Sequence, residues 1–526
     1  MHYIDFDKTA SYKKLLALPA GGKDFKVLLD GERVRNSRVP MAGGLSYSWA
    51  AKGVEKAELE LLRALAEEQE LIGKYRALLD GEFVNTGEKR RVLHHLLRGQ
   101  LGKAVIHEGK DLGKFYAGEL DRFSAFAEDV HGGKIRGSTG KAFTTVVQIG
   151  IGGSDLGPRA LYLALENWAA AEGRQRLRAE FISNVDPDDA SRIAASVSPE
   201  ETIFVLVSKS GTTQETLANE LFIKDKLTKA GLNPGKHLVA VTSETSPLAR
   251  NPAYLDSFYI DDFIGGRYSS TSAVGGVILS LAFGPGVFRE LLAGAHEADR
   301  LALEPEPLKN AALLDARIGV DERNVLGCPS TAVLPYSQAL SRFPAHLQQL
   351  DMESNGKRVN RDGLPLAYAT GPVVFGEPGT NGQHSFYQLL HQGTDIVPLQ
   401  FVGFAESQRG DDLAVDGSVS QTKLKANLAA QIVAFAKGSG VEGPNRNKEF
   451  LGGRPSSLIY GKKLCPQALG ALLAHFENKV MFQGFVWNLN SFDQEGVQLG
   501  KILTKKVLAG NSGDSALEAY GELLGI

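Results

Sequence analysis

The stretch from Gln148 to Pro158, QIGIGGSDLGP, combines glycines with a serine and an aspartate in a pattern that suits anion binding. A β-branched run precedes it at 144–147, and a helix-forming run follows it at 159–165. The glycines let the backbone approach a ligand closely, and Ser154 and Asp155 can cap the start of the helix. Free N–H groups at such a start attract anions, so phosphate is the expected ligand. The spacing does not match dinucleotide or nucleoside-triphosphate loops, and a tight turn without a ligand is the alternative.

A second polar turn, SKSGTTQET at 208–216, follows the apolar run at 202–207. Its hydroxyl groups can donate hydrogen bonds to phosphate oxygens, and they belong to Ser208, Ser210, Thr213 and Thr216. Lys209 adds positive charge, whereas a capping box on Thr213 and Thr216 is the simpler alternative. Turns that follow neighbouring parallel strands meet at one edge of the sheet, so the pair of turns favours a sugar-phosphate site. We expect that site to include Gly153 and Ser154 from the first turn.

The two turns together resemble the sugar-isomerase (SIS) domain of phosphosugar-binding proteins, and the rest of the chain resembles the phosphoglucose isomerase family. Five further segments carry the resemblance: GGRYS at 265–269, DMESNGK at 351–357, GTNGQHSF at 379–386, HQGT at 391–394 and SFDQEGVQLGK at 491–501. An earlier stretch at 84–94 also looks like the family, and the matching segments keep the family's order beyond about residue 80. The resemblance implies an aldose–ketose isomerase that acts on glucose 6-phosphate and fructose 6-phosphate.

This reaction needs a base and a cation. After the sugar ring opens, a proton moves between two adjacent carbons through a cis-enediol, which calls for a carboxylate near the carbon acid and positive charge near the enediolate. By resemblance, Glu353 is the base and Arg267 stabilises the enediolate, since a guanidinium keeps its charge. Taken alone, Glu353 would be read as an exposed helix-end residue and Arg267 as part of a structural ion pair.

The resemblance assigns ring opening to His384 and Lys501, and phosphate contact to Gln494. Histidine titrates near neutral pH, and the family donates it from the neighbouring subunit, which implies a homodimer. Lys501 lies seven residues after Gln494, about two helical turns, so we expect both on one helix face. A capping histidine, an exposed lysine and a capping glutamine are the alternatives. No cofactor is expected, and carboxylate and histidine clusters with metal-ligand spacing are absent from the sequence.

Several positions depart from the family pattern. Ser210-Gly211 replaces the more usual Thr-Phe, Ser270-Thr271 replaces Leu-Trp, Glu495 replaces Trp, and Gly453 replaces Asn. Ser210 keeps a hydroxyl, so phosphate binding should survive. The loss of aromatic side chains either widens the sugar pocket or reflects repacking of its surroundings. The sugar that the protein selects is therefore left open. Every residue assigned to catalysis is present.

The elements that would position these residues alternate between strand and helix from residue 144. Strands are expected at 144–150, 180–184, 202–208 and 237–241, and again at 332–334, 373–376 and 396–404. Helices are expected at 54–79, 115–130, 338–350, from 382, at 419–437 and at 466–486, with a buried helix within 273–288 and a short one near the end. We therefore predict an α/β fold with two doubly wound parallel-sheet sugar-isomerase domains at 115–290 and 291–505. A helical N-terminal region, 1–114, would pack on the larger domain, and a helical tail would span 506–526.

Composition narrows the class of protein. The chain has 526 residues, with 58 basic and 61 acidic side chains and a formal charge of −3. This balance argues against a nucleic-acid binder. Cys328 and Cys465 are the only cysteines and lack metal-ligand spacing, which fits reducing cytoplasm. The first residues lack the apolar core of a signal peptide, and no membrane span is expected.

The predicted function is interconversion of glucose 6-phosphate and fructose 6-phosphate in glycolysis and gluconeogenesis, by a cytoplasmic homodimer. One alternative is an isomerase that also accepts mannose 6-phosphate. Another is a catalytically silent sugar-phosphate sensor, since sugar-isomerase domains also serve regulators. The four assigned catalytic residues argue against the sensor because binding alone needs no base.

Overall fold

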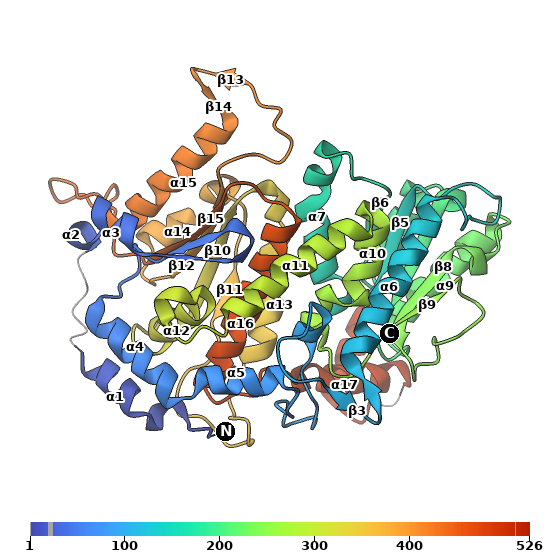
Figure 1. The fold of residues 1–526 in the computed structure, drawn as a ribbon, viewed down its shortest axis with the longest axis horizontal. Coiled ribbons are helices and arrows are strands. Elements are labelled where there is room, and N and C mark those ends of the chain that lie inside the picture. The colour runs from blue at the N-terminus through green and yellow to red at the C-terminus, as the bar shows by residue number, and fades with distance from the viewer. Residues whose placement is uncertain (1, 19–24, 511) are drawn as a thin grey trace. The chain divides into compact units, whose positions relative to one another are not determined.

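The computed structural model of the chain describes residues 2–18, 25–510 and 512–526 (Figure 1). It contains two compact units, Met1–Ser491 and Phe492–Ile526. The larger unit holds two mainly parallel sheets, which confirms the predicted α/β class with doubly wound sheets. The predicted domain boundaries at residues 114, 290 and 505 stay predictions.

The first sheet has five parallel strands in the order β6-β5-β7-β8-β9. The strands are β5 (Thr145–Ile149), β6 (Arg178–Ile182), β7 (Thr202–Val207), β8 (Leu238–Ser243) and β9 (Ser257–Ile260). Every residue of β5 and β7 is buried, because helices cover both faces of a parallel sheet. The sequence patterns predicted the first four strands and missed β9.

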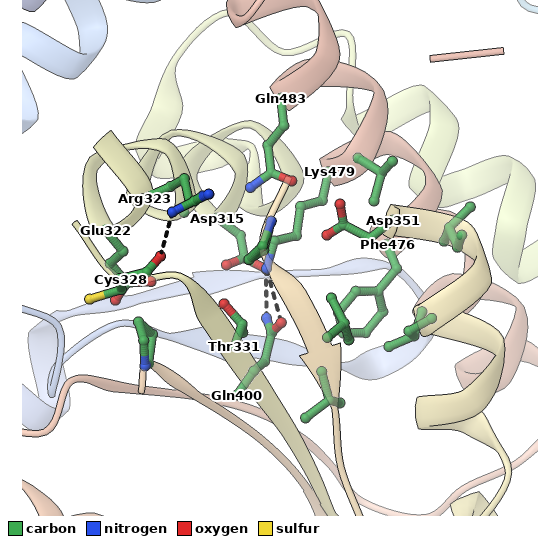
Figure 2. A pocket seen from close by; sticks show the side chains of 18 of the residues that line it. Asp315, Glu322, Arg323, Cys328, Thr331, Asp351, Gln400, Phe476, Lys479 and Gln483 are labelled. Atoms are coloured by element: carbon green, nitrogen blue, oxygen red, sulfur yellow. Dashed lines mark hydrogen bonds and ion pairs between the residues drawn. The ribbon is translucent and has the colours of Figure 1, made fainter. Parts of the chain in front are cut away.

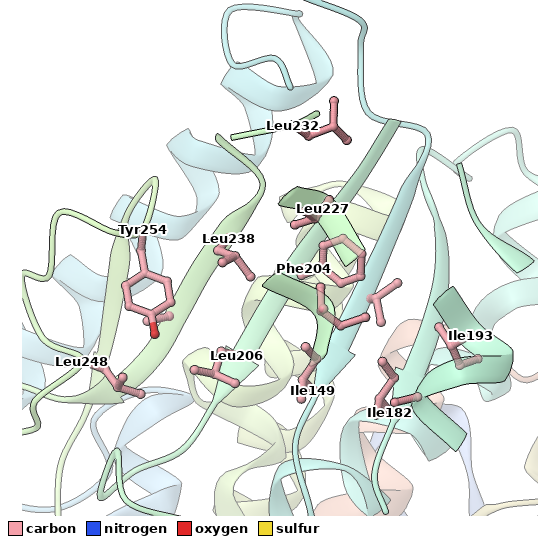
Figure 3. Packing of buried hydrophobic residues seen from close by; sticks show 14 residues of the cluster. Ile149, Ile182, Ile193, Phe204, Leu206, Leu227, Leu232, Leu238, Leu248 and Tyr254 are labelled. Atoms are coloured by element: carbon pink, nitrogen blue, oxygen red, sulfur yellow. The ribbon is translucent and has the colours of Figure 1, made fainter. Parts of the chain in front are cut away.

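Apolar side chains hold helices on both faces of this sheet. Ile149, Phe204 and Leu238 of the strands form one cluster with Ile193 of α8 (Pro187–Ser196) and Leu227 of α9 (Gln214–Lys229) (Figure 3). The other face is covered by α10 (Ala273–Phe283) and α6 (Leu112–His131), which pack on each other. All residues of α10 are buried, as its apolar composition predicts. The remaining helix of this half, α7 (Leu156–Ala171), follows β5.

The second sheet has the order β1-β2-β15-β12-β10-β11. Its parallel part comprises β10 (Ser330–Tyr336), β11 (Val373–Phe375), β12 (Leu399–Phe404) and β15 (Ser456–Gly461). Two N-terminal strands, β1 (Arg38–Pro40) and β2 (Ser46–Ser48), extend it in the antiparallel sense. The sequence patterns missed both N-terminal strands, since three-residue strands carry no usable periodicity, and they also missed the longer β15.

Side chains of this sheet alternate between two different environments. Leu399 and Phe401 of β12 join an apolar cluster with α14 (Tyr387–Gln392) and α15 (Ser420–Lys437). Gln400 lies between them in sequence and points to the opposite face, as the two-residue period of a strand requires. That face is covered by α12 (Ala311–Asn324), α13 (Phe343–Asn355) and α16 (Pro466–Val486).

Helices α11 (Pro285–Leu301) and α16 pack against each other between the two sheets (Figure 1). The two backbones come very close: a Cβ on Gly470 would lie 1.9 Å from the carbonyl oxygen of Leu291. Only glycine fits such a contact. Almost all of α16 is buried even though it carries His475, Glu477 and Lys479, so its polar side chains need partners inside the protein.

Short helices and hairpins complete the chain. The predicted helix at 54–79 is two helices, α4 (Lys56–Glu68) and α5 (Leu71–Leu79), because Glu70 adopts a left-handed φ of 49°. The other N-terminal helices are α1 (Ala10–Ala17), α2 (Phe25–Leu28) and α3 (Gly31–Asn36). Two hairpins pair β3 (Ile106–His107) with β4 (Lys110–Asp111) and β13 (Ala414–Val415) with β14 (Ser418–Val419).

The smaller unit contains α17 (Gln498–Leu508) and α18 (Ser515–Leu524). In both units, no helix formed by the described residues has the length and apolar character needed to cross a bilayer.

Candidate functional site

The two polar turns follow β5 and β7, which are neighbours in the first sheet. From β5 the chain crosses to β6 on one side, and it then returns to β7 on the other side. The loops that follow β5 and β7 therefore leave the carboxyl ends of these strands in opposite directions. Open α/β sheets bind ligands in the crevice between two such loops. The structure thus brings together the two turns that the sequence identified separately.

The first turn contains the 3-10 helix η4 (Gly152–Ser154), which packs against the 3-10 helix η7 (Gly266–Thr271). A Cβ on Gly153 would lie 2.2 Å from the carbonyl carbon of Gly266, so glycine is required for this contact. The capping that we expected from Ser154 and Asp155 is wrong. Asp155 occupies the N-cap of α7 without bonding the helix amides, because its carboxylate pairs instead with Arg159 at 2.7 Å. Ser154 is half-buried beside these amides.

The second turn arranges its hydroxyl groups without a capping box. The buried Ser208 hydroxyl lies 3.1 Å from the Thr213 Oγ1 and accepts from the backbone N–H of Gly211. Thr213 is the N-cap of α9, yet its side chain caps no amide of the helix. Ser210 is exposed, and the Thr216 hydroxyl is buried with no hydrogen-bond partner among the described residues. The amides and hydroxyls at this helix start can therefore serve an anion.

Lys209 is less available than its position in the sequence suggests. Its ammonium group donates to the carbonyl oxygen of Ile264 at 3.2 Å and lies 3.8 Å from a carboxylate oxygen of Asp262. Burial lowers the pKa of Lys209, against the opposing effect of Asp262. Part of its charge is therefore already balanced by the protein.

Arg267 and Glu353 form a direct pair. The Arg267 Nη1 lies 3.0 Å from the Glu353 Oε1, and the guanidinium also donates to the Ser354 Oγ and to the carbonyl oxygen of Ser491, each at 2.7 Å. The arginine side chain is 1% exposed and the glutamate side chain is 21% exposed. A fixed cation thus lies beside a carboxylate that solvent reaches. This arrangement suits a base that works next to developing negative charge.

A layer of aromatic side chains supports the arginine. The Tyr268 hydroxyl lies 2.9 Å from the same Ser354 Oγ, and the Tyr268 ring stacks on His94 at 4.6 Å between ring centroids. Burial raises the pKa of Tyr268 to about 12, so the phenol stays neutral and can donate. The early segment that resembled the family, 84–94, therefore lies behind the predicted catalytic arginine.

Gln349 is a site residue that sequence analysis missed. It lies one helical turn before Glu353 on α13 and therefore shares its face. Its Nε2 would lie 3.4 Å from a Cβ on Gly152, and its buried Oε1 has no hydrogen-bond partner in the described part of the chain. Only the helical register relative to Glu353 could have identified it.

The departures at Ser270 and Thr271 favour repacking over a wider pocket. Their exposed fractions are 1% and 2%, and Arg98 lies 3.3 Å from the Thr271 Oγ1. A Cβ on Gly157 would lie 1.9 Å from the Ser270 Oγ, so this serine is tightly enclosed.

His384 forms no hydrogen bond or ion pair with Arg267 or Glu353 in the part of the chain that the structure describes. It ends the 3-10 helix η10 (Asn381–His384) and is exposed. Its side chain forms no hydrogen bond or ion pair with any residue that the structure describes. No direct polar interaction among the described residues therefore links this predicted catalytic residue to the pair.

Gln494 and Lys501 both belong to the smaller unit and are exposed. The expectation that they share one helix face is wrong. Gln494 precedes the 3-10 helix η11 (Glu495–Val497), and α17, which carries Lys501, begins only at Gln498. Gly496 lowers the helix propensity of this segment.

No group of three or more histidine, cysteine or acidic side chains in the ranges that the structure describes could hold a metal ion.

The chain is similar to known proteins in both sequence and fold. The family model described as phosphoglucose isomerase matches residues 48–521. Glucose-6-phosphate isomerase from Treponema denticola is 62% identical over the full length of both chains. The enzyme of that name from Borreliella burgdorferi is 48% identical over 99% of each. A crystal structure of a glucose-6-phosphate isomerase from Chlamydia trachomatis superposes with a TM-score of 0.92 at 41% identity, covering 99% of each chain.

Proposed function

The chain belongs to the phosphoglucose isomerase family and is an isomerase, and from this premise we propose that it interconverts glucose 6-phosphate and fructose 6-phosphate. The reaction would pass through ring opening and a cis-enediol intermediate. The observation that carries the proposal is the pairing of Arg267 with Glu353 at 3.0 Å next to two turns suited to phosphate.

Glu353 is the proposed base. Its carboxylate takes the proton from C2 of the open-chain aldose and returns it to C1, which yields the ketose. Arg267 stabilises the enediolate that forms between these steps, because its charge is permanent and its direction is fixed by Ser354 and the carbonyl oxygen of Ser491.

The proposed phosphate site uses both polar turns. We assign to it Gly153, Ser154, Ser208, Lys209, Ser210, Thr213 and Gln494. Support comes from the uncapped starts of α7 and α9. Gln349, with its unpartnered amide oxygen, is added as a substrate contact.

His384 and Lys501 are assigned to ring opening, with His384 donated by a second copy of the chain in a homodimer. Support for the dimer comes from the exposed position of His384 beside Leu389, which is 53% exposed on α14. Leu413, directly before the β13–β14 hairpin, is likewise 75% exposed. Exposed apolar side chains near a needed catalytic group favour a partner surface.

The same proposal places the reaction in glycolysis and gluconeogenesis, in the cytoplasm. The free thiols of Cys328 and Cys465 are consistent with a reducing compartment.

The test is a coupled assay of fructose 6-phosphate conversion with the wild type and Glu353→Gln. The variant keeps the size and hydrogen bonding of the side chain but cannot accept the proton. We expect kcat to fall by about a thousandfold while KM changes little. Glu406→Gln, an exposed substitution of the same kind on a residue that pairs with Lys462, is the control and should match the wild type.

Each other outcome supports a different function. Folded wild-type protein that binds sugar phosphate without turnover would indicate the sensor. Comparable turnover of mannose 6-phosphate would indicate the broader isomerase. The buried positions of Ser270 and Thr271 argue against the broader pocket.

A further inference from the structure

A small cavity lies against helix α13, beside Leu347, Leu350 and Asp351 (Figure 2). Its volume is about 30 Å³, and its walls come from α12, α13, α16 and the strands β10 and β12. Thr331 and Gln400 approach it from the strands, and Lys479 and Gln483 from α16. Neither Arg267 nor Glu353 lines it, so this cavity is not part of the proposed active site.

Charges around the cavity are balanced. The basic groups are Lys52, Arg323 and Lys479, and the acidic groups are Asp315, Glu322 and Asp351. Lys52 pairs with Glu322 at 2.7 Å, and Arg323 donates to the carbonyl oxygen of Thr370 at 2.6 Å. The Asp315 carboxylate is saturated, since it receives hydrogen bonds or ion pairs from Tyr47, Gln400, His475 and Lys479.

Two acceptors at the cavity lack a donor. The Asp351 Oδ1 and the Gln483 Oε1 are buried and receive no hydrogen bond from any described residue. The Asp351 residue is 8% exposed. Burial raises the pKa of Asp351 to about 6, although the charge of Lys479 acts in the opposite direction. A buried carboxylate oxygen without a donor is strongly unfavourable, so a partner is needed.

Water is the molecule whose size and chemistry fit. One water needs about 10–15 Å³ of such volume and two to four polar partners, so the cavity has room for about two. A water molecule has two donor hydrogens, which matches the two acceptors, and the Thr331 hydroxyl and the Lys479 ammonium offer further contacts. A metal cation would upset a charge balance that the protein already satisfies.

We propose that this cavity is an internal water-binding site and that Asp351, held by this water, is a positioning residue for Glu353. The second half of the inference rests on the proposed isomerase function, whereas the first half does not.

The helix geometry connects the two residues. Successive helix residues are 100° apart, so Asp351 and Glu353 point to nearly opposite sides of α13. Leu347 and Leu350 accompany Asp351 on the cavity side. The next turn is anchored by Asn355, which donates to the carbonyl oxygen of Val480 on α16 at 3.0 Å. The water bridge to Gln483 would fix the preceding turn to the same helix. The contacts of Asn355 and of Asp351 with α16 would then resist rotation of α13 at two successive turns. This would hold the Glu353 carboxylate within hydrogen-bonding distance of the Arg267 guanidinium.

Crystallography of the wild-type protein tests the water site directly, whatever reaction the protein catalyses. We expect electron density for water within hydrogen-bonding distance of both the Asp351 Oδ1 and the Gln483 Oε1. A well-ordered cavity without density, or a side-chain rearrangement that pairs the two groups with protein donors, would overturn the hydration site.

Enzyme kinetics test the positioning role, using Asp351→Leu, Asp351→Asn and, as a control, Leu347→Val. The control trims the same face of α13 one turn earlier and leaves the polar groups intact. We expect Asp351→Leu to lower kcat about tenfold with KM within about twofold, because a small displacement of a catalytic group slows the chemical step. Asp351→Asn keeps a hydrogen-bonding side chain and should recover most of kcat, and it remains informative if the leucine variant does not fold.

Equal kcat in folded Asp351→Leu, Leu347→Val and wild type would overturn the positioning role, as would an asparagine variant as slow as the leucine variant. A wild type that lacks isomerase activity refutes the proposed function instead, and the crystallographic result then decides the water site alone.

Discussion

At the scale of single residues, the direction of the Arg267 guanidinium matters as much as its charge. Its three nitrogens face acceptors on Glu353, Ser354 and Ser491, so the group cannot turn without breaking bonds. In the proposed mechanism, preorganised charge of this kind would stabilise the enediolate without reorganisation of the protein. A flexible ammonium group would supply charge without this fixed direction.

Arg267→Lys should therefore lower kcat by about a hundredfold or more, with a smaller effect on KM. The lysine retains the charge but cannot reach the Ser354 and Ser491 oxygens together with Glu353. Steady-state kinetics measure the effect, and Arg409→Lys, in an exposed arginine, serves as the matched control. Kinetics of Arg267→Lys within twofold of the wild type would contradict the assigned role.

Asp351 should make stability depend on pH in an unusual direction. Its pKa is raised by burial from 3.8 to about 6, so between these values the folded chain holds a proton that the unfolded chain has released. Asp351 thus contributes most to stability below pH 3.8, the pKa of its carboxyl group in the unfolded chain. As pH rises through 6, the free energy of unfolding falls by about 3 kcal/mol at most.

Asp351→Asn removes this titration. The free energy of unfolding of the variant minus that of the wild type should increase from pH 4 to pH 7, as measured by urea unfolding at each pH. If this difference in the free energy of unfolding stays constant from pH 4 to pH 7, burial does not raise the pKa of Asp351.

At the scale of elements, sequence patterns predicted the strands and helices whose residue order follows a regular pattern of burial. The buried runs at β5 and β7 and the apolar helices α10 and α16 were expected because their composition is set by burial on all sides. The strands β1, β2 and β9 were missed because their short segments are fixed by pairing with distant neighbours. Likewise, the polar turns were predicted from local residue types, whereas Gln349 and Asp351 acquire their roles only from the direction of α13.

The contact between α11 and α16 gives a stability prediction at this scale. Gly470→Ala places a methyl group 1.9 Å from the Leu291 carbonyl oxygen, so the helices must separate. We expect the free energy of unfolding to fall by about 2 kcal/mol or more. Gly118→Ala on α6 is the control, because its methyl group would meet nothing within 4 Å. There, alanine should raise stability by about 0.5–1 kcal/mol through helix propensity. Denaturant unfolding of both variants measures the contrast, and equal effects would contradict the close packing.

At the scale of the whole molecule, the proposed mechanism requires a second copy of the chain. The Arg267–Glu353 pair and the two polar turns belong to one compact unit, but the exposed His384 forms no hydrogen bond or ion pair with that pair among the described residues. If a second copy supplies this histidine, each active site of the dimer combines Glu353 of one chain with His384 of the other. Function would then depend on assembly even though each chain has its own core.

A mixing experiment separates this arrangement from catalysis within one chain. Glu353→Gln and His384→Ala should each be nearly inactive as pure dimers. In a mixed dimer, one site carries both substitutions and the other carries neither. Unfolding the two variants together and refolding them at equal concentration should therefore restore about a quarter of wild-type activity, since about half of the dimers are mixed and each has one intact site. Each variant refolded alone is the control. If His384 served the Glu353 of its own chain, every site would carry one substitution, and the mixture would remain as inactive as its components.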